Sequence, residues 1–296
     1  MTDHILDLSE EGASLKVRHA NLLIAREAQP EVTVPLAEIA ALVLAHPQIR
    51  LSQAVLTGLA EAGGVVVVCD ARRMPSGMLL PLAGNSVQTE RFAQQVNAAL
   101  PLKKRLWQQV VKAKIKAQAR VLDDLHGDDL GLAVLATKVK SGDEGNLEAQ
   151  ASRRYWPALF ADKAFRRNPA AEDQNRYLNY GYAILRGIVA RAICGAGLHP
   201  SLGLHHHNRY DAFCLANDLM EPFRPLVDRA VCQVLAENPP EAPMTKEIKA
   251  ILLQGVTGRL ELEGESRTLF DVAARCATSL VAAYGGQRKS LLIGEL

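Results

Sequence analysis

The chain has 296 residues, of which 48% are hydrophobic and 22% charged, and its formal net charge is +2 at pH 7. This composition is typical of a globular protein, and the length suffices for a large core and two domains. No apolar run approaches the roughly 20 residues of a membrane span, and the start, MTDHILDLSEEG, lacks the features of a signal peptide. We therefore expect a cytoplasmic protein without a membrane segment.

Cysteine usage agrees with that compartment. The five cysteines are scattered along the chain, and no pair has the CxxC spacing of a zinc or redox site. We expect free thiols in a reducing environment.

The first ~85 residues have the pattern of strands. Residues 14–26, SLKVRHANLLIAR, alternate apolar and polar side chains around a turn at His19–Ala20–Asn21. Further strands are predicted in EVTVPL, IAALVLAHPQIRLS and the buried run VVVVCD. Between the last two, QAVLTGLAEAGG predicts a short helix that Ser52 caps and Gly63–Gly64 end. The turn-rich segment MPSGMLLPLAGNS closes this region.

After Ser86 the pattern becomes helical. Helices are predicted at Gln88–Leu100, Leu102–Asp124, Leu130–Lys140, Asp143–Phe160, Asp173–Gly195, Tyr210–Glu237, Thr245–Gln254 and Ser266–Tyr284. The change in composition predicts two domains, a β-rich one over residues 1–87 and an all-helical one over residues 88–296. The fold class is therefore α+β, with a small strand domain before a large helical domain.

Positive charge is concentrated in the second part. Residues 1–87 carry a net charge of −3 and residues 88–296 a net charge of +5, and Leu102–Arg120 holds seven Lys/Arg and no acid. A basic helical face of this kind suits a phosphate backbone, although a solvated helix face would have the same pattern. The candidate DNA-binding residues are Lys103, Lys104, Arg105, Lys112, Lys116, Arg153 and Arg154.

The segment GLHHHNRYDAFCLANDLMEPFRPLVD contains the residues best suited to chemistry. Asp218 and Glu221, three residues apart, share one face of a predicted helix. Pro222 and Pro225 each remove a helical hydrogen bond beside these carboxylates. Such local costs are common at functional sites. A bent helix with surface acids, neutralised by Arg224 or Arg229, is the simpler alternative.

The three histidines before this helix favour a metal site. A histidine beside two carboxylates offers mixed nitrogen and oxygen ligands, which Mn²⁺ or Mg²⁺ accepts. Zinc is disfavoured, because the chain has no HExxH motif and no paired cysteines. Successive side chains of an extended loop alternate sides, so we expect one of the three histidines to bind the ion.

A further carboxylate is expected from DEGNLEAQASRRYWPALF. Asp143 is placed to cap the start of this helix, which leaves Glu144 as an acid of the first turn. Glu148 shares a helix face with Leu147, Ala151 and Tyr155, a partly buried stripe. A carboxylate on such a face needs a partner, and a metal ion is one.

Together these motifs resemble one family. DLMEPFRPLVD, the preceding G-L-x-H loop, and a Glu seven positions before a Tyr are similar to the CRISPR adaptation integrases, the first of the numbered CRISPR-associated proteins. The resemblance extends over essentially the whole chain and is closest to compact versions found beside a single large effector nuclease. It implies a β-sandwich-like N-terminal domain and an all-helical catalytic domain. It also implies a homodimer that assembles 4:2 with a small ferredoxin-like partner and acts on double-stranded DNA.

The resemblance also implies a site. The family's metal ligands correspond to Glu148, His206 and Glu221, and Asp218 matches an acidic position that assists the site or the DNA. The implied reaction is phosphoryl transfer with Mg²⁺ or Mn²⁺, in which a DNA 3′-hydroxyl attacks a phosphodiester at the end of a repeat.

Three other functions stay open at this stage. A branched-DNA nuclease without integration would use the same site, with water as the attacking group. A non-enzymatic DNA-binding scaffold would need no chemistry from Glu148. A non-haem iron oxygenase would use two histidines and one carboxylate but has no need of a basic surface.

Overall fold

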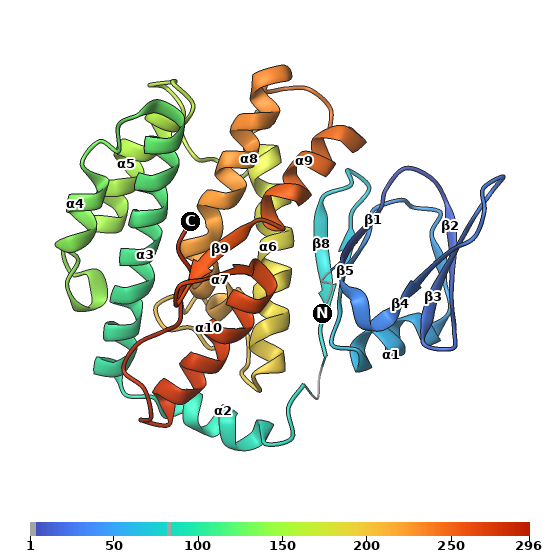
Figure 1. The fold of residues 1–296 in the computed structure, drawn as a ribbon, viewed down its shortest axis with the longest axis horizontal. Helices are drawn as coiled ribbons and strands as arrows, with labels where there is room; N and C mark the ends of the chain where they lie inside the picture. Colours follow the sequence, from blue (N-terminus) through green and yellow to red (C-terminus); the bar gives the residue numbers. More distant parts are fainter. Residues whose placement is uncertain (1–3, 82–83) are drawn as a thin grey trace.

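The computed structural model describes residues 4–81 and 84–296, and Figure 1 shows strands at one end of the molecule and helices at the other. The fold is therefore α+β, with N-terminal strands followed by a helical region. The N-terminal elements are β1 (His4–Leu8), β2 (Ala13–Arg18), β3 (Asn21–Arg26), β4 (Val32–Pro35), β5 (Ile39–Leu44), β6 (Arg50–Leu51), α1 (Gln53–Glu61), β7 (Val65–Cys69) and β8 (Pro75–Leu79).

These strands form two four-stranded sheets, with the orders β1-β5-β7-β8 and β4-β3-β2-β6. β5 lies parallel to both β1 and β7, so the two most apolar strands occupy the middle of their sheet. Val65 and Val67 face the core of the helical region, whereas Val66 faces a second core shared with α1 and the other sheet. Burial on both faces explains why the β7 sequence is a continuous valine run.

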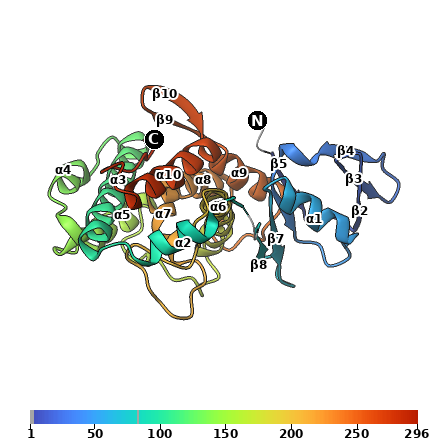
Figure 2. The ribbon, with the colours of Figure 1, turned by 90° about the horizontal axis from the view of Figure 1, so that it is seen from below.

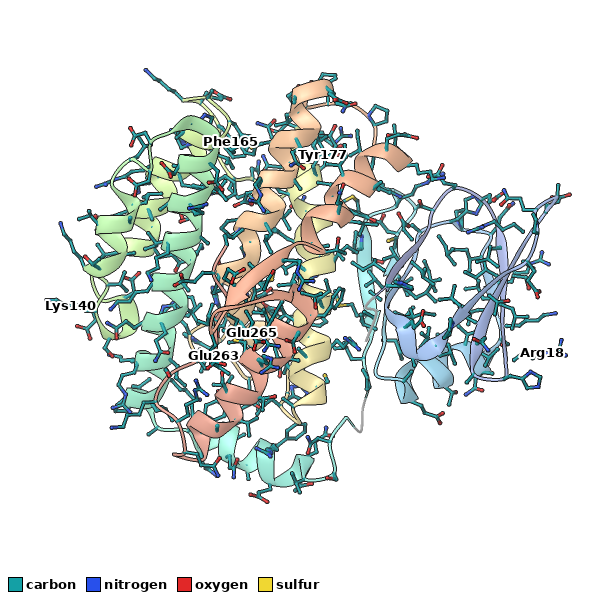
Figure 3. All side chains as sticks on the ribbon, viewed as in Figure 1. Arg18, Lys140, Phe165, Tyr177, Glu263 and Glu265 are labelled. Atoms are coloured by element: carbon teal, nitrogen blue, oxygen red, sulfur yellow. The ribbon has the colours of Figure 1, made fainter. Side chains whose placement is uncertain are left out.

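The helical region contains α2 (Gln88–Val96), α3 (Leu100–His126), α4 (Leu132–Thr137), α5 (Leu147–Leu159), α6 (Asn175–Gly195), α7 (Cys214–Met220), α8 (Arg224–Glu237), α9 (Lys246–Val256) and α10 (Leu269–Tyr284). The prediction of an all-helical second part was wrong at one place. β9 (Arg259–Leu262) and β10 (Glu265–Thr268) form a hairpin, and the labels of Glu263 and Glu265 mark it in Figure 3. None of the helices in the described ranges is long and apolar enough to cross a membrane.

Helix α6 runs through the middle of the helical region, with α7 to α10 around it (Figure 2). Most of its side chains are buried, and it also contacts β5, β7 and β8. Gly181 permits the close approach of α8, because a Cβ at this position would lie 2.4 Å from Val227 Cγ1. The packing of α6 thus fixes both the neighbouring helices and the central sheet.

Most predicted elements of the N-terminal part are confirmed. β2 and β3 pair around His19 and Ala20, whose φ angles of 49° and 59° are those of a tight hairpin turn. Ser52 is the residue before α1, but its side chain makes no capping hydrogen bond. The segment predicted as turn-rich contains β8, and its residues 82–83 lie outside the described part. All five cysteines lie within that part and are free thiols.

A buried ion pair joins the strand and helical regions. Lys249 of α9 is 1% exposed, and its Nζ lies 3.9 Å from Oδ2 of Asp7 on β1. The same carboxylate accepts hydrogen bonds from Ser9 and from Tyr180 of α6. Burial raises the pKa of Asp7, and the attraction of Lys249 opposes that rise.

This pair yields a prediction about stability. Lys249→Met should lower the free energy of unfolding by about 3 kcal/mol, because Asp7 stays buried without its counter-ion. Asp7→Asn combined with Lys249→Met should cost no more than Lys249→Met alone, since no uncompensated charge is left. Urea unfolding of the wild type, both single variants and the double variant measures the coupling. If the double variant lost the sum of the free energies lost by the two single variants, Asp7 and Lys249 would not be energetically coupled.

Candidate metal centre

Two carboxylates from separate helices meet at a single ammonium group. Lys114 Nζ of α3 lies 2.6 Å from Glu148 Oε1 of α5 and 2.6 Å from Glu221 Oε2, which follows α7. The side chains of Lys114 and Glu221 are 11% and 5% exposed, so this cluster is largely shielded from water. The two acids that the sequence predicts as ligands are therefore brought together, with a cation already between them.

Glu148 is positioned by the start of α5. Asp143 accepts hydrogen bonds from the backbone N–H groups of Leu147 and Glu148, at 2.9 and 3.0 Å, and so satisfies two free donors at the start of α5. The prediction that the helix starts at Asp143 with Glu144 in its first turn was wrong, because α5 begins at Leu147. Glu148 thus lies in the first turn, where the helix dipole favours negative charge. Glu144, by contrast, pairs with Lys104 at the surface.

Glu221 is positioned by an interrupted helix. α7 ends at Met220, Glu221–Phe223 form a 3₁₀ turn, and α8 begins at Arg224, which confirms the predicted interruption. Arg224 Nη2 lies 3.0 Å from Glu221 Oε1, so the arginine is a counter-ion as the simpler alternative proposed. Glu221 is nevertheless buried, so it is not the surface acid that this alternative assumed. Arg229 pairs elsewhere, with Asp124.

Asp218 organises the histidine loop from inside the protein. Its fully buried carboxylate accepts hydrogen bonds from the backbone N–H groups of Leu204, His205 and His206, and it contacts His206 Nδ1 at 2.5 Å. Gly203 allows this tight turn, because a Cβ there would lie 2.2 Å from the His206 carbonyl oxygen. With Nδ1 held, His206 has Nε2 free to bind an ion.

The three histidines have different surroundings. His205 stacks on the buried ring of Trp107 from α3, with ring centroids 4.4 Å apart and an interplanar angle of 3°. His206 meets the same ring edge-on. His207 Nδ1 contacts the His205 carbonyl oxygen within the exposed loop. Trp107 is therefore a core residue that supports the loop, and His206 is the histidine held beside the acids.

The charges of this cluster depend on one another. The contact with Asp218 raises the pKa of His206, and attraction to Glu221 and Glu148 adds to it against partial burial. Burial would raise the pKa of Glu221, but Arg224 and Lys114 hold it below its ordinary value. Burial would lower the pKa of Lys114, but Glu221 and Glu148 raise it above the ordinary value. The Glu221 carboxylate and the Lys114 ammonium are thus both charged at neutral pH.

The donor set fits a divalent cation. Glu148 and Glu221 supply hard oxygen ligands, His206 supplies a nitrogen, and the acids already enclose a cationic group. No three His, Cys, Asp or Glu side chains of the described residues form a ready metal cluster. Lys114 lies between the two acids in this metal-free arrangement.

A second polar network holds the helices around the site. Asp228 of α8 is buried and accepts hydrogen bonds from Tyr155 of α5, at 2.9 Å, and from Tyr182 of α6. The Tyr182 ring also lies 4.8 Å from the Arg224 guanidinium. Because Tyr155 shares α5 with Glu148, this network ties the two acid-bearing segments to the central helix.

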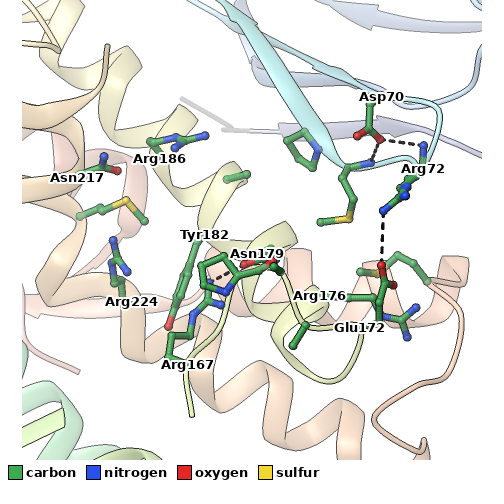
Figure 4. A pocket seen from close by; sticks show the side chains of 18 of the residues that line it. Asp70, Arg72, Arg167, Glu172, Arg176, Asn179, Tyr182, Arg186, Asn217 and Arg224 are labelled. Carbon is green, nitrogen blue, oxygen red and sulfur yellow. Dashed lines mark hydrogen bonds and ion pairs between the residues drawn. The ribbon is translucent and has the colours of Figure 1, made fainter. Parts of the chain in front are cut away.

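A cavity of about 1090 Å³ opens beside these residues, and His206 and Arg224 belong to its lining. Figure 4 shows that Arg167, Arg186 and Arg224 project into it, with Arg72 and Arg176 at its far side. Burial lowers the pKa of Arg167 and Arg186. Poorly hydrated guanidinium groups in a cavity are suited to binding phosphate.

The predicted basic helix divides into an inner and an outer face. Three basic residues of α3 have no ion-pair partner among the described residues, namely Lys103, Arg105 and Lys112, and the same holds for Arg153 of α5. On α3, Lys104 and Lys116 pair with Glu144 and Glu295. Arg154 donates a hydrogen bond to the Leu130 carbonyl. Lys114 is the exception within the acid-free block, because it points inward.

The sequence contains a signal for the inward position of Lys114. Trp107, Val110, Val111 and Gln118 are buried on α3, and Lys114 lies at helical spacing from all four. A lysine on an apolar stripe requires an acidic partner, so this position predicts a contact with a buried carboxylate. Asp228 and Tyr182 carried no comparable local signal.

Comparison with known proteins identifies the class of protein. The family model described as "CRISPR associated protein Cas1" matches residues 6–253. A curated relative from Neisseria meningitidis serogroup C (strain 8013), named CRISPR-associated endonuclease Cas1, is 38% identical over 259 residues, 86% of this chain and 84% of the relative. The chain therefore belongs to the Cas1 family.

Two solved structures share the fold. A casposase bound to an integration product is 20% identical with a TM-score of 0.79, and the match covers 97% of this chain and 92% of the casposase. A chain of a Cas6-RT-Cas1–Cas2 complex is 18% identical with a TM-score of 0.75, over 99% of this chain and 36% of the other.

The buried Asp228 predicts a pH dependence of stability. Burial raises its pKa to about 6, while the unfolded chain has the ordinary value near 4. Between these values only the folded protein holds the proton, so this group's contribution to stability falls as the pH rises through about 6. Relative to Asp228→Asn, the wild type should gain about 2 kcal/mol between pH 7 and pH 4.

Urea unfolding of both proteins at several pH values tests this, since all other acids are common to the pair. A difference between wild type and Asp228→Asn that stays constant from pH 4 to pH 7 would contradict the raised pKa.

Proposed function

We propose that this chain is a metal-dependent DNA endonuclease and integrase of CRISPR spacer acquisition. It joins the 3′-hydroxyl ends of short foreign DNA to the repeat array by transesterification, with Mg²⁺ or Mn²⁺ as cofactor. The observation that carries the proposal is that Glu148 and Glu221 both contact the ammonium group of Lys114. His206 and an arginine-lined cavity lie next to them.

In this mechanism the protein binds and orients, and no side chain acts as nucleophile. Glu148, Glu221 and Nε2 of His206 would hold the ion, and Asp218 keeps His206 in the required orientation. When bound, the ion lowers the pKa of the attacking hydroxyl and offsets negative charge on the phosphate. The DNA 3′-oxygen forms a bond to phosphorus, the P–O3′ bond of the repeat strand breaks, and the departing oxygen takes up a proton.

The arginines of the cavity would hold the phosphates of the DNA near the acids. Arg224 bridges the two parts, because it contacts Glu221 and also faces the cavity. Lys103, Lys104, Arg105, Lys112, Lys116, Arg153 and Arg154 extend this positive surface along α3 and α5. Phosphate contacts of this kind supply affinity without reading sequence.

The proposal includes an assembly. We infer that residues 1–87 form a β-sandwich-like domain for dimerisation and partner binding, and that residues 88–296 form the catalytic domain. Two homodimers would assemble with two copies of the small ferredoxin-like partner. The fold likeness to a chain of a Cas6-RT-Cas1–Cas2 complex supports such a partner.

A branched-DNA nuclease is the second candidate, because the same acids would serve hydrolysis. A strand-transfer assay separates the two, since only an integrase yields a product joined to repeat DNA. The further alternative is a DNA-binding scaffold without chemistry. Loss of DNA cleavage and joining on replacement of Glu148, with folding intact, would exclude it.

The three proposed ligands can be tested by substitution. Glu148→Ala, His206→Ala and Glu221→Ala should each reduce joining of a short duplex to repeat DNA by more than ~100-fold, because each removes a metal ligand. DNA binding should persist, because the basic surface is intact. His207→Ala is the matched control and should be mild, since its ring contacts the loop backbone. Near wild-type joining by two of the three variants would overturn the ligand assignment.

The basic surface predicts a salt dependence. Affinity for duplex DNA should fall steeply with salt, and Lys103→Ala combined with Arg105→Ala should lower the slope of log affinity against log salt by about 1.8. Lys16→Ala with Arg18→Ala removes the same charge from exposed positions on β2 and should leave the slope unchanged. If the two double variants gave the same slope of log affinity against log salt, Lys103 and Arg105 would face solvent without contacting DNA.

A further inference from the structure

We propose that Lys114 is an exchangeable counter-ion of the metal centre. Its ammonium group holds Glu148 and Glu221 together in the metal-free protein and withdraws when a divalent ion binds between them. This inference rests on the proposed function, because it takes both carboxylates as ligands of the ion.

The need for a cation follows from the burial of two like charges. Glu221 is 5% exposed and Glu148 25% exposed, so water screens their repulsion poorly. They belong to α5 and to the turn before α8, and Lys114 comes from a third element, α3. One ammonium at 2.6 Å from both acids therefore sets their separation across three segments of the fold.

The same geometry excludes simultaneous occupancy. Mg²⁺ and Mn²⁺ bind carboxylate oxygens at about 2.1 Å, so an ion shared by Glu148 and Glu221 would occupy the space next to the ammonium group. A protonated amine has no lone pair to donate to a metal, and the two cations would repel each other. Entry of the ion thus requires Lys114 to leave at least one carboxylate.

The side chain is suited to such a movement. The lysine ammonium ends a flexible four-carbon stem. The guanidinium of Arg224 is rigid and planar, and it contacts the other oxygen of Glu221, Oε1. Arg224 therefore keeps Glu221 oriented while Lys114 moves. The charges also balance, because Lys114 and Arg224 together neutralise Glu148 and Glu221 in the metal-free protein.

Two consequences distinguish an exchangeable counter-ion from an ordinary structural salt bridge. Loss of Lys114 should destabilise the metal-free protein, because the two acids then have no cation between them and only Glu221 keeps a counter-ion, Arg224. It should also tighten metal binding, because the ion no longer displaces an ammonium group. A salt bridge with no relation to the ion would produce the first effect alone.

The test compares purified full-length wild type with Lys114→Met. Mn²⁺ titration by calorimetry should give a Kd about tenfold lower for Lys114→Met. Thermal unfolding in chelator should show a lower Tm for the variant, and Mn²⁺ should raise its Tm more than that of the wild type. Lys138→Met removes the same group from an exposed position on α4's C-terminal side and should change neither quantity.

Glu148→Gln, measured in parallel, separates this proposal from the proposed function. If Glu148→Gln weakens Mn²⁺ binding while Lys114→Met leaves it unchanged or weakens it, the exchange is wrong and the metal site stands. If Glu148→Gln leaves Mn²⁺ binding unchanged, the metal site itself is wrong.

A variant that does not fold in chelator still gives an answer. The exchange predicts that Mn²⁺ restores the folding of Lys114→Met, because the ion replaces the missing cation. Failure of Mn²⁺ to rescue the variant would overturn the proposal.

Discussion

Two ionised carboxylates in a poorly hydrated space repel each other, and a cation between them offsets this repulsion. Glu148 and Glu221 are in this position, and the Lys114 ammonium group lies 2.6 Å from each of them. The arrangement of α3, α5 and the turn after α7 depends on this contact, because each contributes one of the three charged groups. The interaction thus connects the stability of the helical region with the chemistry proposed for it.

The remaining packing holds this cluster in place. The buried Asp228 joins Tyr155 of α5 to Tyr182 of α6, and Asp218 fixes the loop that carries His206. α6 in turn packs against the central sheet, so the position of the site is linked to the N-terminal strands. The basic helix α3 has two roles in this account. Its outer face is suited to DNA, and its inward-facing Lys114 contacts Glu148 and Glu221.

Much of the fold was predictable because its signals are local. The valine run of β7, the hairpin turn at His19 and Ala20, and the proline interruption after Met220 each follow from neighbouring residues. Strand β8 and the β9–β10 hairpin were missed, since their short, polar sequences are stabilised by pairing with distant segments. The sequence indicated Glu148, His206 and Glu221 by residue type and motif. It could not show that Lys114 lies between the acids, because that contact joins residues far apart in the chain.

A crystal structure of the protein soaked with Mn²⁺, with anomalous scattering to locate the ion, tests the central claim most directly. The account predicts an anomalous peak at the oxygens of Glu148 and Glu221 and at Nε2 of His206. In the same crystal, Lys114 Nζ should have withdrawn from the 2.6 Å contact with at least one acid. Mn²⁺ bound elsewhere, or bound at this site while Lys114 keeps both contacts, would contradict the account.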